Sequence, residues 1–190
     1  QSGHIEAIGF ELYTQMLVCA VREMKGEAAP DEAETQLNLG LNIRIPADYV
    51  PEENQRLQMY KRVARVETES QLNDVSAELQ DRYGPPPPAV RNLLDYASLK
   101  LLCMKVGVNA IERKRDFVTL KFQQNAAVDP EQLARFVSAQ RGAQFTPDGM
   151  LKFALKATAA EEVLRALRTV LEQLASAESA SEVRSASRPA

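Results

Sequence analysis

The chain has 190 residues, of which 45% are hydrophobic and 26% are charged, and its formal net charge at pH 7 is −3. A chain of this length can form one domain with appendages and bury roughly two-thirds of its unfolded surface. These ordinary fractions exclude a collagen, a wholly disordered chain and a disulfide-built miniprotein. The sequence pI near 5.4 argues against a protein that mainly neutralises phosphates, because that requires clustered Lys and Arg. Nucleic acid is therefore not the first partner to expect.

The apolar runs and the cysteines bear on the compartment. No apolar run approaches the roughly 20 residues that cross a bilayer, and no signal-peptide pattern opens the sequence, so the sequence predicts a soluble, cytoplasmic chain. Cys19 and Cys103 lie far apart without CxxC spacing. We expect two free, buried thiols and neither a disulfide nor a metal pair.

The residue types that catalysis needs are scarce. The eight glycines are scattered singly, so neither a GxxxxGK[ST] phosphate loop nor a GxGxxG motif occurs. The only histidine is His4, which leaves no imidazole base for a Ser or Cys nucleophile elsewhere in the chain. We therefore expect no catalytic, metal-binding or cofactor-binding residues.

Apolar positions recur at helical spacing over residues 5–26, which predicts a helix that ends at Gly26. Residues 27–34 are rich in acids and alanine and predict a linker. From Leu37 to Ile45 apolar and polar residues alternate strictly, which predicts a strand buried on one side and ended by Pro46. The next helix is predicted over 52–66. Its inward face should hold Leu57, Tyr60, Val63 and Ala64.

Thr68 and Gln71 have the spacing of a capping box, so a second helix should begin there and end at Gly84. Its inward stripe is Leu72, Val75, Leu79 and Tyr83. After four prolines at 85–88, a helix over 88–106 is predicted, with Gly107 as its stop. We expect Val90, Leu93, Leu94, Ala97, Leu101 and Met104 to face inward along it.

Two short strands are predicted at 111–116 and 117–122, followed by a helix that Asp129 and Pro130 begin and that runs through Val137. A further hairpin should join 143–145 to 151–155 through a Pro-Asp-Gly turn. Thr158 with Glu161 should open the last helix. Its apolar positions are Val163, Leu164, Leu167, Val170, Leu171 and Leu174. The polar residues 175–190 predict a disordered tail.

This order of elements predicts an α+β fold, in which small mixed or antiparallel sheets pack with several amphipathic helices. Strands and helices do not alternate regularly, which disfavours a doubly wound sheet. No fixed period repeats, which disfavours a solenoid.

Three separated blocks carry a resemblance to a known family. They are QSGHIEAIGFELYTQML at the start, RLQMYKRVARVETESQLNDVSAELQDRYG in the middle and the helix after the prolines. Together they resemble the C-terminal part of the bacterial transcription-repair coupling factors, from residue 1 to about 174. The resemblance implies that 1–26 is the end of the second translocase lobe, that 27–34 is a linker and that 35–174 is a C-terminal regulatory domain.

The resemblance implies a function for the parent protein and for this part of it. Members of the family remove stalled RNA polymerase at DNA lesions and recruit excision repair through UvrA. ATP and Mg serve the motor domains, which also contact DNA, and none of the helicase motifs is in this chain. The C-terminal domain is expected to be non-catalytic and autoinhibitory. It would pack on the N-terminal UvrB-like module of the same chain, mask its UvrA-binding surface and restrain the motor.

The second predicted helix carries an acidic stripe opposite its apolar stripe, formed by Asp74, Glu78 and Asp81, with Arg82 at its margin. In the family, the ELxDR segment faces basic residues of the N-terminal module, and the matching positions are Glu78, Asp81 and Arg82. We expect these four residues to form the interdomain contact. The alternatives are a solvent-exposed helix face and, for Arg82, an i, i+4 pair with Glu78.

A second hypothesis assigns the chain a contact with nucleic acid or polymerase through the basic cluster Arg113, Lys114 and Arg115, with Lys121 nearby. A charged hairpin tip that guards a sheet edge explains the same residues. Detached from its partner, the first helix would expose an apolar face, so a non-physiological dimer of the isolated chain is a further expectation.

Overall fold

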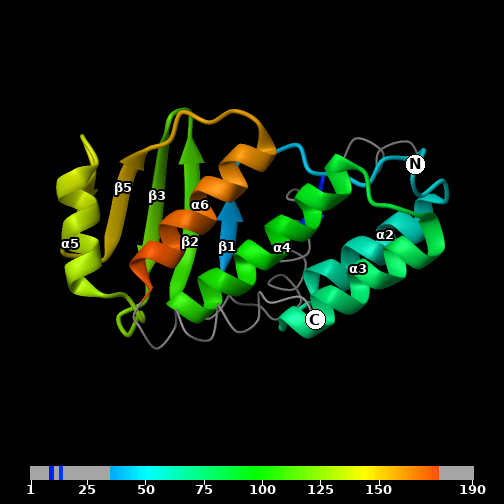
Figure 1. Ribbon diagram of the computed structural model, residues 1–190, viewed down its shortest axis with the longest axis horizontal. Coiled ribbons are helices and arrows are strands. Elements are labelled where there is room, and N and C mark those ends of the chain that lie inside the picture. The colour runs from blue at the N-terminus through cyan, green and yellow to red at the C-terminus, as the bar shows by residue number, and fades with distance from the viewer. Residues whose placement is uncertain (1–8, 11–12, 15–34, 176–190) are drawn as a thin grey trace, which may run out of the picture. The chain divides into compact units, whose positions relative to one another are not determined.

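A computed structural model describes residues 9–10, 13–14 and 35–175, and Figure 1 shows their helices and strands. The described part contains five helices and five strands, which confirms the α+β class. The helices are α2 (Glu53–Ala64), α3 (Glu69–Tyr83), α4 (Pro88–Val106), α5 (Pro130–Ala139) and α6 (Ala160–Leu174). The strands are β1 (Gln36–Asn38), β2 (Val108–Lys114), β3 (Phe117–Phe122), β4 (Gln144–Phe145) and β5 (Met150–Ala154).

These residues form two compact units. The helical unit contains 9–10, 13–14 and 41–98, which include α2, α3 and the first half of α4. The sheet unit contains 35–40 and 99–175, which include the rest of α4, all the strands, α5 and α6. The predicted helix over 5–26 lies almost entirely outside the described residues, as do His4, Cys19 and the tail beyond 175. No described helix is long and apolar enough to span a membrane.

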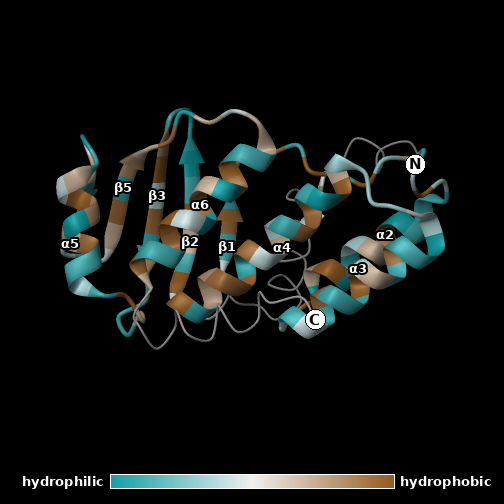
Figure 2. Ribbon diagram, viewed as in Figure 1, coloured by the Kyte–Doolittle hydropathy of each residue, from teal (hydrophilic) through white to brown (hydrophobic). Residues whose placement is uncertain are grey.

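The sheet unit is built on one mixed sheet with the strand order β1-β2-β3-β5-β4. β1 runs parallel to β2, and the other neighbouring strands pair antiparallel. Ile111, Leu120 and Leu151 lie in register across three strands and are fully buried. Helix α6 lies across this face of the sheet in Figure 1, and hydrophobic and hydrophilic residues both line it in Figure 2, as an amphipathic helix requires.

The long strand predicted from Leu37 to Ile45 is only partly correct. Burial alternates as expected through all of these residues, but ladder pairing stops at Asn38. Gly40 has a φ of +65°, which turns the backbone out of the extended conformation. Beyond it the chain passes into the helical unit, where the Ile45 N–H donates to the Tyr60 hydroxyl at 2.7 Å. Alternation predicts which side chains are buried, but it does not supply a partner strand.

Helix α2 is present as predicted, but its buried stripe differs by one position. Met59 and Arg56 are buried with Tyr60 and Val63, while Leu57 and Ala64 are only half-buried. Arg56 can be buried because its guanidinium donates to the carbonyl oxygens of Val50 and Pro51, at 2.7 and 2.8 Å. The apolar residues alone did not predict this buried set, because it includes an arginine.

The predicted helix caps have different outcomes. Thr68 caps α3, because its hydroxyl accepts from the Gln71 N–H at 3.2 Å, and the Gln71 side chain accepts from the Glu67 N–H at 2.8 Å. Asp129 caps α5 through the N–H groups of Glu131 and Gln132. The prediction for Thr158 was wrong: α6 begins after Ala159, with no side-chain cap.

The predicted hairpin through Pro147–Gly149 is confirmed as β4 and β5. Cys103 is a free, fully buried thiol, and burial raises its pKa. Met104 was expected to face inward but is 44% exposed, because the buried face of α4 at this point is formed by Leu101, Leu102 and Cys103.

Gly107 ends α4 in a conformation and a space that only glycine fits well. Its φ is +83°, and a Cβ added there would lie 2.7 Å from the Ala126 Cα. We expect Gly107→Ala to combine left-handed strain of about 1–2 kcal/mol with a clash that adds about 1–3 kcal/mol, because backbone cannot move aside cheaply. Urea unfolding of the 190-residue chain measures the loss.

The matched control is Gly142→Ala, because Gly142 has nearly the same φ, +82°, with nothing within 4 Å of the added Cβ. It should lose only the strain. Equal losses for the two variants would contradict the close approach at Gly107.

Candidate functional site: the acidic face of helix α3

Helix α3 places the predicted contact residues opposite its buried stripe. Leu72, Val75 and Leu79 are buried, and Leu79 is fully so. Asp74 and Asp81 lie on the other side and are exposed, as is Arg82, while Glu78 is half-buried. At 1.5 Å per residue, the carboxylates of Asp74 and Asp81 are separated by about 10 Å along the helix axis. The four predicted residues therefore share one face.

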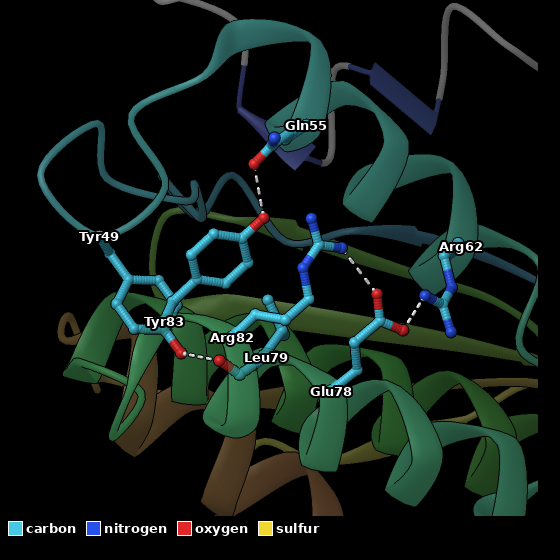
Figure 3. Close-up of polar contacts among 7 residues, drawn as sticks. All are labelled: Tyr49, Gln55, Arg62, Glu78, Leu79, Arg82 and Tyr83. Atoms are coloured by element: carbon cyan, nitrogen blue, oxygen red, sulfur yellow. Dashed lines mark hydrogen bonds and ion pairs between the residues drawn. The ribbon is translucent and has the colours of Figure 1, made fainter.

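Glu78 has partners within the chain on both of its carboxylate oxygens. The Arg82 guanidinium donates to one oxygen at 2.9 Å, and the Arg62 guanidinium, from α2, donates to the other (Figure 3). The hydrogen bond from Arg62 is the main cause that lowers the pKa of Glu78. Burial opposes it, and the hydrogen bond from Arg82 lowers the pKa further. Glu78 thus holds an arginine from each of two helices. We call these three residues, Arg62, Glu78 and Arg82, the arginine clamp.

The i, i+4 pair that competed with an interface role for Arg82 is therefore present. The Arg82 guanidinium also lies 5.1 Å from the centroid of the Tyr83 ring, a cation–π distance. Its side chain is nevertheless 40% exposed. The guanidinium consequently keeps donors that a further acceptor can reach, since it has five N–H groups in all.

Asp74 and Asp81 differ from Glu78. Both are exposed, and among the residues that the structure describes neither carboxylate forms an ion pair. The face therefore consists of two free carboxylates on either side of a positioned clamp. Such an arrangement can accept charge-assisted hydrogen bonds from basic side chains of another surface.

Two tyrosines support the C-terminal end of α3. The Tyr49 hydroxyl lies 3.0 Å from the Leu79 carbonyl oxygen (Figure 3) and 2.9 Å from that of Gly84, so its single O–H proton is shared between two carbonyls near the end of the helix. The Tyr83 hydroxyl donates to the Gln55 side chain of α2 at 2.7 Å. Burial is the main cause that raises the pKa of Tyr49, and the neighbouring Tyr83 raises it further.

The sequence did not single out Arg62, Tyr49 or Gln55. Arg62 is 16 residues from Glu78, and no local spacing rule joins residues so far apart. The available signal was that Arg62 lies in the last turn of a helix. A short turn joins this helix to the next one, and such a turn places two helices side by side.

The basic cluster of the second hypothesis is divided in the structure. Arg113 lies on the helix-covered side of β2 and donates to the Ala157 carbonyl oxygen at 2.6 Å. Lys114 pairs with Glu112 at 3.1 Å, and Arg115 occupies the turn with a φ of +56°. The three residues therefore do not form one basic surface. Within the described ranges, no group of three or more His, Cys, Asp and Glu residues could hold a metal ion.

The arginine clamp generates a pH-dependent prediction. Two exposed ion pairs contribute about 0.2–1 kcal/mol each, so Glu78→Gln should lower the free energy of unfolding by about 1 kcal/mol at neutral pH. The folded pKa of Glu78 lies below the ordinary value of 4.5. The clamp therefore stabilises the fold above that value, and this stabilisation disappears as the pH falls through the lowered pKa. Urea unfolding of both forms at several pH values measures the difference.

Glu172→Gln is the control, because Glu172 makes a single i, i+4 pair with Arg168 at 3.6 Å. We expect its effect to be at most half that of Glu78→Gln. A difference between wild type and Glu78→Gln that persists unchanged in acid would contradict the clamp.

The chain is similar to proteins with one shared name. A family model described as the TRCF domain matches residues 39–133. The transcription-repair-coupling factor of Haemophilus influenzae is 35% identical over 158 residues, which are 80% of this chain and 14% of that protein. The one from Escherichia coli is 34% identical over 145 residues, 74% of this chain and 13% of that protein. The chain thus spans about one-seventh of the length of these relatives.

A solved structure shows the same fold. The crystal structure of a C-terminal domain of transcription-repair coupling factor superimposes with a TM-score of 0.62 at 22% identity, covering 82% of this chain and 96% of that one. The family model itself matches half of the 190 residues. The chain therefore belongs to the TRCF domain family.

Proposed function

We propose that this chain is a non-catalytic, autoinhibitory regulatory domain of a transcription-repair coupling factor. The acidic face of α3 (Asp74, Glu78, Asp81 and Arg82) would dock on a basic surface of the N-terminal UvrB-like module of the same protein. The observation that carries the proposal is the pair of exposed, free carboxylates, Asp74 and Asp81, on either side of the positioned arginine clamp.

The chemistry of this face suits a contact that must open. Interfaces between domains of one chain are polar and of modest area, which permits release. Removing one partner of a buried interfacial charge pair costs about 2–5 kcal/mol, while a rim pair contributes little. Two carboxylates about 10 Å apart can each receive a basic side chain, so a small number of charge pairs would decide between the closed and open states.

The clamp gives the face a defined shape before docking. Because Arg62 and Arg82 hold the Glu78 carboxylate, that side chain loses little rotamer entropy when a partner binds, and pre-organisation of this kind raises affinity. Glu78 then positions Arg82 beside Asp81, and Asp74 and Asp81 supply the free negative charge. The predicted contact residues would thus have different tasks.

Docking would mask the UvrA-binding surface of the N-terminal module and restrain the ATP-driven motor until RNA polymerase is engaged. ATP and Mg would act in the motor domains. The alternative, a contact with nucleic acid or polymerase through Arg113, Lys114 and Arg115, has less support, because Arg113 is committed to backbone carbonyls of the sheet unit.

The test is charge reversal at the two free carboxylates. We expect Asp74→Lys combined with Asp81→Lys to reduce capture of the separately produced N-terminal module by the 190-residue chain at least tenfold, since about 1.4 kcal/mol corresponds to tenfold. In the full-length protein the same pair of changes should raise basal ATPase activity and UvrA binding. Glu78→Lys is less informative, because it would also break the arginine clamp.

The control is Glu162→Lys combined with Glu172→Lys, which makes the same change of charge on the exposed side of α6. It should leave capture and ATPase activity unchanged. If reversal on α3 also leaves capture, ATPase activity and UvrA binding unchanged, the proposal is wrong.

A further inference from the structure

The sheet unit has a second surface that the docking of α3 does not use. Strand residues alternate between the two faces of a sheet. Since Val118, Leu120 and Phe122 of β3 are buried, Phe117, Thr119 and Lys121 point to the opposite face. Phe117 is 46% exposed and Lys121 is exposed. We call this surface the open face of the sheet.

The pairing register brings basic residues from three strands onto the open face. Lys114 of β2 lies opposite Phe117, and Lys152 of β5 lies opposite Thr119. Lys121 is two residues along β3 from Thr119, so its Cα is about 8 Å from that of Lys152. The single acid among the paired residues of β2, β3 and β5 on this face is Glu112, which Lys114 neutralises at 3.1 Å. Lys121 and Lys152 form no ion pair within the described part of the chain.

An exposed aromatic ring, that of Phe117, lies at one end of this group of lysines. The Lys152 ammonium is 5.1 Å from the centroid of the Phe117 ring. An exposed phenylalanine beside lysine side chains on an open sheet has the chemistry of a stacking platform: the ring takes a nucleobase and the lysines take neighbouring phosphates. Lys152 would move from the ring to a phosphate when a base stacks.

The helices leave this face to solvent. Phe136 of α5 packs edge-on against Phe153, a buried residue of the other face, with ring centroids 5.3 Å apart. Helix α6 lies across that same covered face (Figure 1). None of the described helices of the sheet unit covers Phe117, Lys121 or Lys152, because all three remain exposed.

We propose that the open face of the sheet binds single-stranded nucleic acid, with Phe117 stacking on a base and Lys121 and Lys152 contacting neighbouring phosphates. The exposed ring distinguishes this partner from the two closest alternatives. Duplex backbone offers phosphates but no accessible base face, and an acidic polypeptide needs the ammonium groups but not the ring. The site is separate from α3, and the proposal does not depend on autoinhibition.

The experiment is fluorescence anisotropy of a labelled oligothymidylate with the 190-residue chain. Two phosphate contacts give a salt slope of about 1.4, so affinity should fall by about sevenfold between about 50 mM and about 200 mM salt. Lys121→Ala combined with Lys152→Ala should weaken binding at low salt and reduce that slope by about 1.4. Phe117→Leu should weaken binding at least about fivefold and leave the slope unchanged, because only stacking is lost.

The matched control is Lys61→Ala combined with Lys105→Ala, two exposed lysines on α2 and α4, which should bind like wild type. Thermal unfolding of every variant verifies the fold, and the lysine pair tests the site even if Phe117→Leu is destabilised. No binding at low salt, or equal loss in both lysine pairs, would overturn the proposal. Equally tight binding of a duplex would also overturn it. So would displacement of the oligothymidylate by polyglutamate if Phe117→Leu bound the oligonucleotide as tightly as wild type.

Discussion

The burial of one side of each element decides what its other side can do. Leu72, Val75 and Leu79 must face inward in α3, and the helical period then places Asp74 and Asp81 outward. In the sheet, burial of Leu120 and Val118 places Thr119 and Phe117 on the opposite face for the same reason. Both candidate surfaces are thus by-products of core formation, and a shift of one residue in either element would eliminate them.

This constraint explains why much of the fold could be predicted from the sequence. The cap at Thr68, the hairpin around Gly149 and the stripe of α3, except for the half-buried Tyr83, depend on spacing within a few residues, and they are present. The limits of the strand at Leu37 and the buried stripe of α2 depend on distant partners. Strand pairing needed β2, which begins 70 residues after β1 ends, and burial of Arg56 needed the carbonyl oxygens of Val50 and Pro51.

The candidate site divides in the same way. Periodicity placed Asp74, Glu78 and Asp81 on one side of a helix, but charge alone did not separate a carboxylate held by two arginines from the free ones. That distinction comes from Arg62, on a different helix. The cluster at 113–115 shows the opposite error, because three adjacent basic residues on a strand and its turn point in different directions and cannot act as one patch.

The two candidate surfaces belong to different compact units, and this has a consequence for regulation. The acidic face of α3 lies in the helical unit and the open face lies in the sheet unit. They share no residue, and their charges are opposite in sign, so a basic partner and an anionic strand would not compete for the same groups. Within the described residues the chain joins the two units at Gly40 and along α4, which is continuous from one unit into the other. Energetic coupling between sites requires an element with two discrete arrangements, and a continuous helix and a single glycine are the covalent routes available for it in the described chain.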